Sequence, residues 1–541
     1  MKRGFFLLAL LGCVTSFAAD LDALRTLCPA GDSVRVQESL TVRGIVISDC
    51  RSENMELNPN LSYKKVDETF NQKTAYIQTK DGSCGVRLRF AAPEDNVLQR
   101  YDAVELELQG CTLLHEANPD RMTVLHLRSA NIQGRTAGVA ADVPLKERSI
   151  AALSDADVYT FVTIPDAEMV FKGGCFTDVY DNYGLYCPAI HDDPSTHKPY
   201  YTVSGRMDGW ASLIRDGAGS TLYLLVNSLC PWRRDGNGVP QGVGPLSGII
   251  VHTPMRRYGG DMGRYSIRPV DRKDIKMGRK KGPWKILTGW ELDGTQGQQL
   301  EFELLGLQSG VWKNGKKGDR VVADVGKTTG FLWTDSDSFI HIGNDLNALD
   351  AAQKGTVGNG SVVFKGPTTG WFDFNEEGKA VGSRSVLIEF STRKLKASEL
   401  AFSFAWTNGE PNANTCWGFP AEWRVQCSID GQPWMNLKET ATGNEIFMLR
   451  SHPWYDTNVE GVGHRKTGYD CGFGMQQRSF RLPSEAIGHE KIFLRIVPAT
   501  NRIFVLRGNP ENESVCDRII TPDNQKARTF LSFGQIMVEY R

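Results

Sequence analysis

Two clusters of histidine and aspartate are the residues whose types and spacing could do chemistry. The segment CPAIHDDPSTH brings together four side chains that could ligate a metal ion, namely His191, Asp192, Asp193 and His197. A polar surface insertion is the simpler interpretation. Further on, His452 and His464 flank PWYDTNVEGVG, with Asp470 after them, so a general acid–base pair could form there. No nucleophile or substrate-binding motif accompanies this pair.

Motifs of established catalytic chemistry are absent from the sequence, which contains no HExxH, GxSxG or GxGxxG. VGKTTG resembles the end of a phosphate-binding loop, but Val321 stands where such a loop needs its first glycine. DSDSF, which begins at Asp335, could ligate calcium, although a plain polar turn explains it as well. The sequence therefore predicts no catalytic residue, no metal and no cofactor. It favours a non-catalytic protein without deciding whether a residual activity exists.

Aromatic side chains in polar loops are the better candidates for a binding site. The chain has 12 Trp, and several of its aromatic residues lie outside the strand patterns: Trp232, Trp417, Trp454 and Tyr455. Flat aromatic rings stack on sugars or bases, because both present apolar planes beside hydrogen-bonding edges. The alternative is that these rings anchor loops to the core. Arg233 and Arg234, next to Trp232, would suit an anionic or nucleic-acid ligand.

The N-terminus predicts export. In MKRGFFLLALLGCVTSFAAD, Lys2 and Arg3 precede a short apolar run and then small residues, so residues 1–18 are predicted to be a signal peptide. The protein is then expected in the periplasm, on the outer surface or secreted. LLGC, ending at Cys13, gives an alternative, a lipoprotein box that would anchor the chain to a membrane.

Export makes disulfides chemically accessible. Eleven cysteines follow Cys13, an odd number, so at least one is free or pairs outside the chain. Cys175 and Cys187 are predicted to form a local disulfide within an inserted loop. For the other cysteines, small buried thiols in strands are an equally good interpretation.

The elements that would carry these residues are strands. AYIQTKDGSCGVRLRF and GWASLIRDGAGSTLYLLV repeat one pattern, in which alternating apolar residues flank an Asp-Gly turn. The flanking segments follow in the same order in both copies, which predicts two small OB-like barrels in tandem, at residues 34–140 and 150–277. Long polar insertions precede the hairpin in both copies and are where such folds place their binding loops.

The remaining chain is predicted to be a β-sandwich. Residues 278–285 form a basic linker expected to be solvated, and residues 286–541 alternate apolar and polar positions in several long strands. On this pattern Val386, Ile388 and Phe390 share one face, as do the alternate residues of two further strands, which are Phe402, Phe404, Trp406, Trp423, Val425, Cys427 and Ile429. The fold class is therefore all-β.

The repeated blocks resemble an OB-fold-like domain family of unknown function found in exported proteins of Bacteroidota. The resemblance spans about residues 34–277 and rests on LTVRGIVISD, AYIQTKDGSCGVRLRF and GPLSGIIVHTPMRRYGGDMGRYSIRPVDRKDI. It implies a fold and no established activity. Proteins with this domain often carry a nuclease–phosphatase-like domain or a sandwich beside it.

The C-terminal portion is similar to the galactose-binding-like (discoidin-type) jelly roll. The resemblance rests on WRVQCSIDGQPWMNL, followed in order by KIFLRIVPA and GQIMVEYR. The Asp-Gly-x-x-Trp pattern builds a hairpin and packs a tryptophan, so it implies the fold and transfers no binding residue.

Taken together, these features predict a non-catalytic protein of the cell envelope that recognises a glycan or another surface polymer. One alternative is an accessory or degenerate part of an exported nuclease or phosphoesterase system, whose OB-like barrels would handle nucleic acid. Another is a structural or adhesive envelope protein. The net charge of -1 gives the whole chain no bulk attraction to nucleic acid or to an anionic membrane, and membrane contact is expected only if Cys13 is lipidated.

Overall fold

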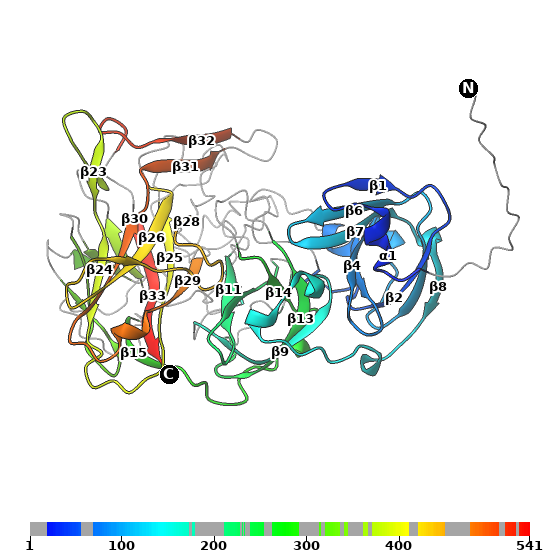
Figure 1. Cartoon of the computed structure of the whole chain (residues 1–541), viewed down its shortest axis with the longest axis horizontal. Helices are drawn as coiled ribbons and strands as arrows, with labels where there is room; N and C mark the ends of the chain where they lie inside the picture. Colours follow the sequence, from blue (N-terminus) through cyan, green and yellow to red (C-terminus); the bar gives the residue numbers. More distant parts are fainter. Residues whose placement is uncertain are drawn as a thin grey trace, which may run out of the picture. The chain divides into compact units, whose positions relative to one another are not determined.

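The computed structural model of the chain describes residues 19–52, 54–55, 69–171, 176–178, 210–227, 230, 232, 239–253, 262–290, 313–314, 320–335, 340–343, 361–365, 370–409, 420–448, 476–507, 514–525 and 530–541. These residues are almost entirely β, with two short α-helices, α1 (Ala23–Leu27) and α2 (Thr69–Gln72). The prediction of an all-β protein is confirmed (Figure 1). No helix in this described part is long and apolar enough to cross a membrane.

Contacts within the chain define two compact units. The first combines Met1–Cys50, Lys73–Pro144 and Asp155–Thr160, and the second combines Arg51–Gln72, Leu145–Ser154 and Phe161–Arg541. The second unit thus holds both the strands of the second barrel and the sandwich.

The first unit is built on one eight-stranded sheet in the order β1-β6-β7-β4-β3-β2-β5-β8. Neighbouring strands are antiparallel except for β4 and β7, which are parallel. The apolar positions of these strands face one core, which includes Val42, Ile77, Leu88 and Val124. The strands are β1 (Ser33–Arg35), β2 (Thr41–Val46), β3 (Thr74–Gln78), β4 (Gly85–Phe90), β5 (Ala103–Glu107), β6 (Thr112–Ala117), β7 (Asp120–Leu127) and β8 (Ile132–Thr136).

In the second unit, five strands close into a barrel in the order β9-β11-β12-β14-β13 and back to β9. Here β12 and β14 are the parallel pair, as β4 and β7 are in the first unit. In an OB-like barrel, a first strand is followed by a hairpin, and a later strand pairs in parallel with the second strand of that hairpin. These five strands have this connectivity. The strands are β9 (Phe161–Met169), β11 (Trp210–Arg215), β12 (Thr221–Leu224), β13 (Gly244–Val251) and β14 (Ser266–Arg268), with β10 (Thr177–Asp178) pairing on β11.

The two Asp-Gly hairpins close differently. In the first, Gly82 takes the left-handed backbone that the motif predicts, with φ of 71°. In the second, the left-handed residue is Gly219, with φ of 79°, and not Gly217. Gly217 instead donates its N–H to Asp166 Oδ2 at 2.9 Å, and a Cβ there would lie 2.1 Å from that oxygen. We expected Asp216-Gly217 to repeat the first turn. That expectation was wrong, because the glycine with the left-handed backbone is Gly219.

The sandwich has two main sheets. One runs β16-β20-β21-β33-β15-β18, with β25 and β29 joined to it through β33, and the other runs β17-β19-β24-β30-β26-β27, with β28 on β26. The strands of the first sheet are β15 (Lys285–Trp290), β16 (Lys313–Asn314), β18 (Val325–Gly326), β20 (Ile340–Gly343), β21 (Ser361–Lys365), β25 (Leu400–Gly409), β29 (Gln476–Arg481) and β33 (Phe530–Tyr540). Those of the second are β17 (Val321–Val322), β19 (Phe331–Thr334), β24 (Val386–Phe390), β26 (Glu422–Ile429), β27 (Met435–Asn436), β28 (Phe447–Met448) and β30 (Ile492–Pro498).

Two short hairpins complete the unit: β22 (Phe372–Phe374) with β23 (Ala380–Ser383), and β31 (Arg502–Arg507) with β32 (Ser514–Ile519).

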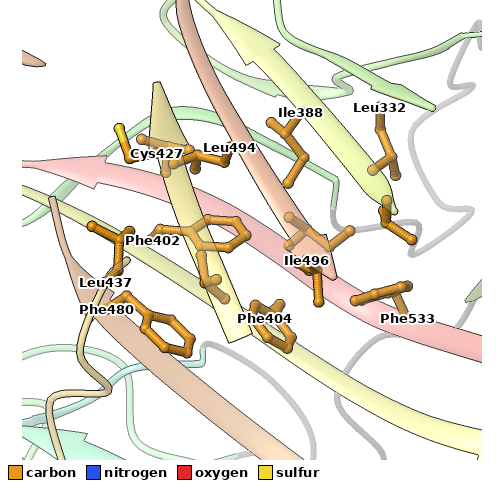
Figure 2. Close-up of a cluster of buried hydrophobic side chains, with 14 of the residues drawn as sticks. Leu332, Ile388, Phe402, Phe404, Cys427, Leu437, Phe480, Leu494, Ile496 and Phe533 are labelled. Carbon is orange, nitrogen blue, oxygen red and sulfur yellow. The ribbon is translucent and has the colours of Figure 1, made fainter. Parts of the chain in front are cut away.

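The core of the sandwich lies between the two main sheets. Figure 2 shows Leu332, Ile388 and Leu494 of one sheet facing Phe404 and Phe533 of the other. Every residue that the sequence assigned to the inner face is buried, from Val386 on β24 to Ile429 on β26. Because side chains alternate along a strand, this burial also determines which residues must face outward.

Candidate ligand-binding face

Most of the side chains that the sequence singled out lie outside the described residues. These are Trp417, Trp454, Tyr455, the pair Cys175 and Cys187, and the clusters His191, Asp192, Asp193, His197, His452, His464 and Asp470. Their predicted roles stay predictions. Among the described cysteines, Cys28, Cys84, Cys111 and Cys427 are free thiols.

Trp232, which is described, packs beside the second barrel. Its ring stands edge-on to Phe176, with 5.8 Å between centroids and 80° between planes. Phe176 is buried, and the guanidinium of Arg272 lies 5.1 Å from its centroid. Trp232 itself is half-buried, so one part of its ring anchors the loop while another part still reaches solvent.

The two motifs that could bind ions are structural where they are described. The Asp335 carboxylate accepts hydrogen bonds from the Ser385 N–H at 2.7 Å and the Ser385 hydroxyl at 2.6 Å, so both of its oxygens are engaged. Gly326 of VGKTTG lies in β18, paired with β15, and is not part of a phosphate-binding loop. No three His, Cys, Asp or Glu side chains gather as a metal site within the described ranges.

The outer face of the second sandwich sheet combines aromatic and charged side chains. One line of residues crosses its strands, and we call it the outer row. In order of pairing it consists of Trp333, Leu387, Arg495, Gln426 and Asn436. The first four are half-buried and Asn436 is exposed, whereas their inward-facing neighbours form the core. The row covers four strand spacings, ~19 Å.

Arg320 and Trp333 form one end of the outer row. The Arg320 guanidinium lies 4.4 Å from the Trp333 ring centroid and 5.5 Å from that of Phe331. Its Nη1 also donates to Glu389 Oε2 at 3.1 Å, and 41% of the Arg320 side chain is exposed. A guanidinium over an indole at the surface holds the ring in one orientation and adds hydrogen-bond donors beside it.

Arg495 and Trp434 form a second stack, near the middle of the row. The Arg495 guanidinium lies 4.3 Å from the Trp434 ring centroid, and its Nε donates to Gln426 Oε1 at 2.6 Å. Trp434 is half-buried and follows the Asp430-Gly431 turn, whose φ values of 47° and 81° are those of a tight hairpin. The Trp predicted to pack after this turn therefore packs on the outer face.

Sequence reasoning missed this face because it looked for aromatics in loops. The alternation that identified the inner residues also identifies the outer ones, and FLWT alone places Phe331 and Trp333 together. The stacking partners, however, lie outside these strand patterns: Arg320 precedes β17, and Trp434 follows a turn that is distant in sequence from Arg495. Flat rings, guanidinium planes and amide groups on one rigid sheet can bind an extended polymer through stacking and hydrogen bonds.

Comparison with known proteins adds little to this geometry. No family model and no curated protein matches the chain. Among solved structures, the enzymatically active domain of tailspike protein 4 from bacteriophage CBA120 matches 39% of this chain at 7% identity, with a TM-score of 0.17. This chain spans only 19% of the length of that one.

Proposed function

We propose that this is a non-catalytic binding protein of the cell envelope that recognises a glycan or other surface polymer on the outer face of the sandwich. The observation that carries the proposal is the outer row, with a tryptophan–guanidinium stack at one end and another near its middle. Trp333 and Arg495 lie on strands held by the core, and their partners Arg320 and Trp434 directly precede β17 and β27, so the binding surface is rigid before any ligand arrives. A rigid surface loses little conformational entropy on binding.

The same reasoning supports polymer recognition over catalysis. An active site needs a nucleophile or a general acid–base pair within hydrogen-bond reach of a reacting group. Beside the outer row, Glu389 is paired with Arg320, and the nearby Asp335 accepts hydrogen bonds from Ser385. The proposal includes the expectation that the protein is exported, and it keeps the two family resemblances as expectations.

Binding of the full-length protein to a panel of purified polysaccharides tests the proposal. Trp333→Ala and Trp434→Ala should each weaken binding of any polymer that is retained by roughly tenfold or more, since one aromatic stack contributes ~1–3 kcal/mol. Trp333→Phe should keep most of the affinity because it keeps a ring. Met435→Ala is the matched control, because Met435 is an exposed apolar residue of β27 that alternates with the row residue Asn436.

Two outcomes would contradict the proposal. A protein that retains no polysaccharide of a broad panel is not a glycan binder. If Trp333→Ala and Trp434→Ala bind normally while Trp232→Ala, Trp417→Ala or Trp454→Ala does not, the site lies in the loops that the sequence singled out.

A further inference from the structure

Two arginines on the outer face, Arg424 and Arg495, stand next to each other, and no carboxylate in the described part of the chain forms an ion pair with either. Arg495 pairs with Gln426 in the sheet, so Arg424, two residues before Gln426 on β26, lies diagonally beside Arg495 on the same face. Within the described residues, neither guanidinium has a carboxylate within 4.0 Å. Other arginines of this domain do have such a partner, for example Arg502, which pairs with Glu422. Like charges in adjacent positions of a sheet repel each other.

Much of their hydrogen-bonding capacity is also unused. Arg424 donates from Nη2 to the Ala499 carbonyl at 3.0 Å, while its Nε is buried and has no acceptor in the described part of the chain. Among the described residues, Arg495 donates only from Nε, to Gln426 Oε1 at 2.6 Å. A guanidinium carries five N–H donors in a planar fork, so this pair offers several donors to an incoming acceptor.

The electrostatic surroundings leave the pair short of negative charge. Burial lowers the pKa of Arg495, the Asp335 carboxylate partly restores it, and the nearby Arg424 lowers it further. The charge of Asp335 acts more strongly on Arg495 than that of Arg424, but the Asp335 oxygens accept their hydrogen bonds from Ser385. An anion placed between the two guanidinium groups would balance their positive charge.

We infer that Arg424 and Arg495 form a subsite for the acidic group of an anionic polysaccharide, a carboxylate or a sulfate, whose sugar rings lie along the outer row. The inference rests on the proposed function and names the ligand class. A bidentate fork fits the paired oxygens of either group, and Trp434, stacked on Arg495, places a flat ring beside it.

The composition of the face favours a sparsely charged polymer over nucleic acid. Among the described residues, Arg320, Arg424 and Arg495 share this face with the carboxylates Glu389, Asp335 and Glu422. A strand of nucleic acid carries a phosphate at every residue and needs a groove that is positive along its length. Glu389 and Asp335 would repel such a chain, whereas a polysaccharide with spaced acidic groups can place one at the arginine pair.

Binding of the full-length protein to matched charged and neutral polymers tests the inference. Alginate supplies carboxylates, dextran sulfate supplies sulfates on a backbone whose neutral form is dextran, and poly(dT) represents nucleic acid. Wild type should bind alginate or dextran sulfate and bind dextran at least tenfold more weakly. Which of the two acidic polymers binds more tightly identifies the acidic group.

Substitutions locate the subsite. Arg424→Gln and Arg495→Gln should each weaken binding of the acidic polymer at least tenfold, and the double variant should flatten its salt dependence. Arg424→Lys and Arg495→Lys keep the charge and lose the fork, so an intermediate loss is expected. Arg393→Gln is the matched control, since Arg393 is an exposed arginine paired with Glu490 outside the outer row. Unchanged circular dichroism shows that each variant is folded.

The outcomes separate this inference from the function on which it rests. If Trp333→Ala weakens binding of a neutral polysaccharide and the arginine variants do not, the glycan-binding proposal stands and the anionic subsite is wrong. Affinity for dextran that equals the affinity for both alginate and dextran sulfate also overturns the subsite. Tighter binding of poly(dT) than of either acidic polysaccharide overturns it in favour of nucleic acid. If no polymer binds, both proposals fail.

Discussion

Arg215 and Glu539 form a buried bidentate ion pair across 324 residues of sequence. Nη1 lies 2.6 Å from Oε2 and Nη2 lies 2.9 Å from Oε1, while Nε of the same arginine donates to Glu168 at 2.7 Å. The Arg215 guanidinium lies 4.6 Å from the centroid of the Trp284 ring, which is itself buried. The arginine and the two lysines at 279–281, just before Trp284, are exposed, as expected for a solvated linker. The triad connects the second barrel to the last strand of the sandwich within one unit.

Removing the cation from this triad should destabilise the larger unit. Arg215→Met leaves the Glu168 and Glu539 carboxylates buried without a partner, so the free energy of unfolding should fall by ~3–5 kcal/mol at pH 7. Urea denaturation at pH 7 measures this.

Arg393→Gln, in the exposed pair with Glu490, is the comparison for that experiment, and should change stability by less than ~1 kcal/mol. An Arg215→Met protein as stable as wild type at pH 7 would show that the triad contributes nothing to the fold.

Gly219 should be harder to replace than Gly217, although Gly217 belongs to the Asp-Gly pair. Gly219 has φ of 79°, and a Cβ there would meet Trp284 at 2.9 Å, so Gly219→Ala adds backbone strain of ~1–2 kcal/mol to a steric clash. Gly217→Ala meets only the Asp166 carboxylate, which can rotate away. Chemical denaturation of the two variants compares them. A larger loss of stability for Gly217→Ala than for Gly219→Ala would contradict this prediction.

Asp81 should make the stability of the first unit depend on acid pH. Hydrogen bonds from the Thr79 hydroxyl, the Ser83 hydroxyl and the Ser83 N–H lower the pKa of Asp81 to about 2. Because the folded pKa lies below the unfolded value of about 3.9, the stabilisation is complete above pH ~4 and is lost as the pH falls toward 2. Asp81→Asn should remove this part of the acid dependence in denaturation experiments. An NMR titration that finds the Asp81 carboxyl near pH 4 would refute it.

The buried cysteines should be thiols that react only after unfolding. Burial raises the pKa of Cys84 to about 12, against the lowering effect of nearby Arg25, and that of Cys427 to about 12. Both are therefore protonated at pH 8 and should resist alkylation by iodoacetamide in the native protein. After denaturation without reductant both should be alkylated, which mass spectrometry detects. Failure to label them then would mean that they are in disulfides.

Local patterns in the sequence determined the strand content of the protein. Alternation along SVLIEFST, AFSFAW and WRVQCSI placed every inner-face residue correctly, because a strand must turn alternate side chains toward the core. The repeated hairpins likewise predicted two related sets of strands, and each set contains one parallel pair, β4 with β7 and β12 with β14. Burial of apolar side chains is a local requirement, so the sequence shows it directly.

Only the tertiary structure decided which distant side chains meet. The second hairpin shows this on a small scale, since Asp166 from another strand accepts the Gly217 N–H and occupies the space beside that glycine. On a larger scale, Arg495 reaches Trp434, and Arg424 comes to lie beside Arg495 through the pairing of β26 with β30. Contacts between strands far apart in sequence depend on sheet order and register, which no local pattern records. The candidate binding face consists of such contacts, whereas the core that supports it could be predicted from alternation alone.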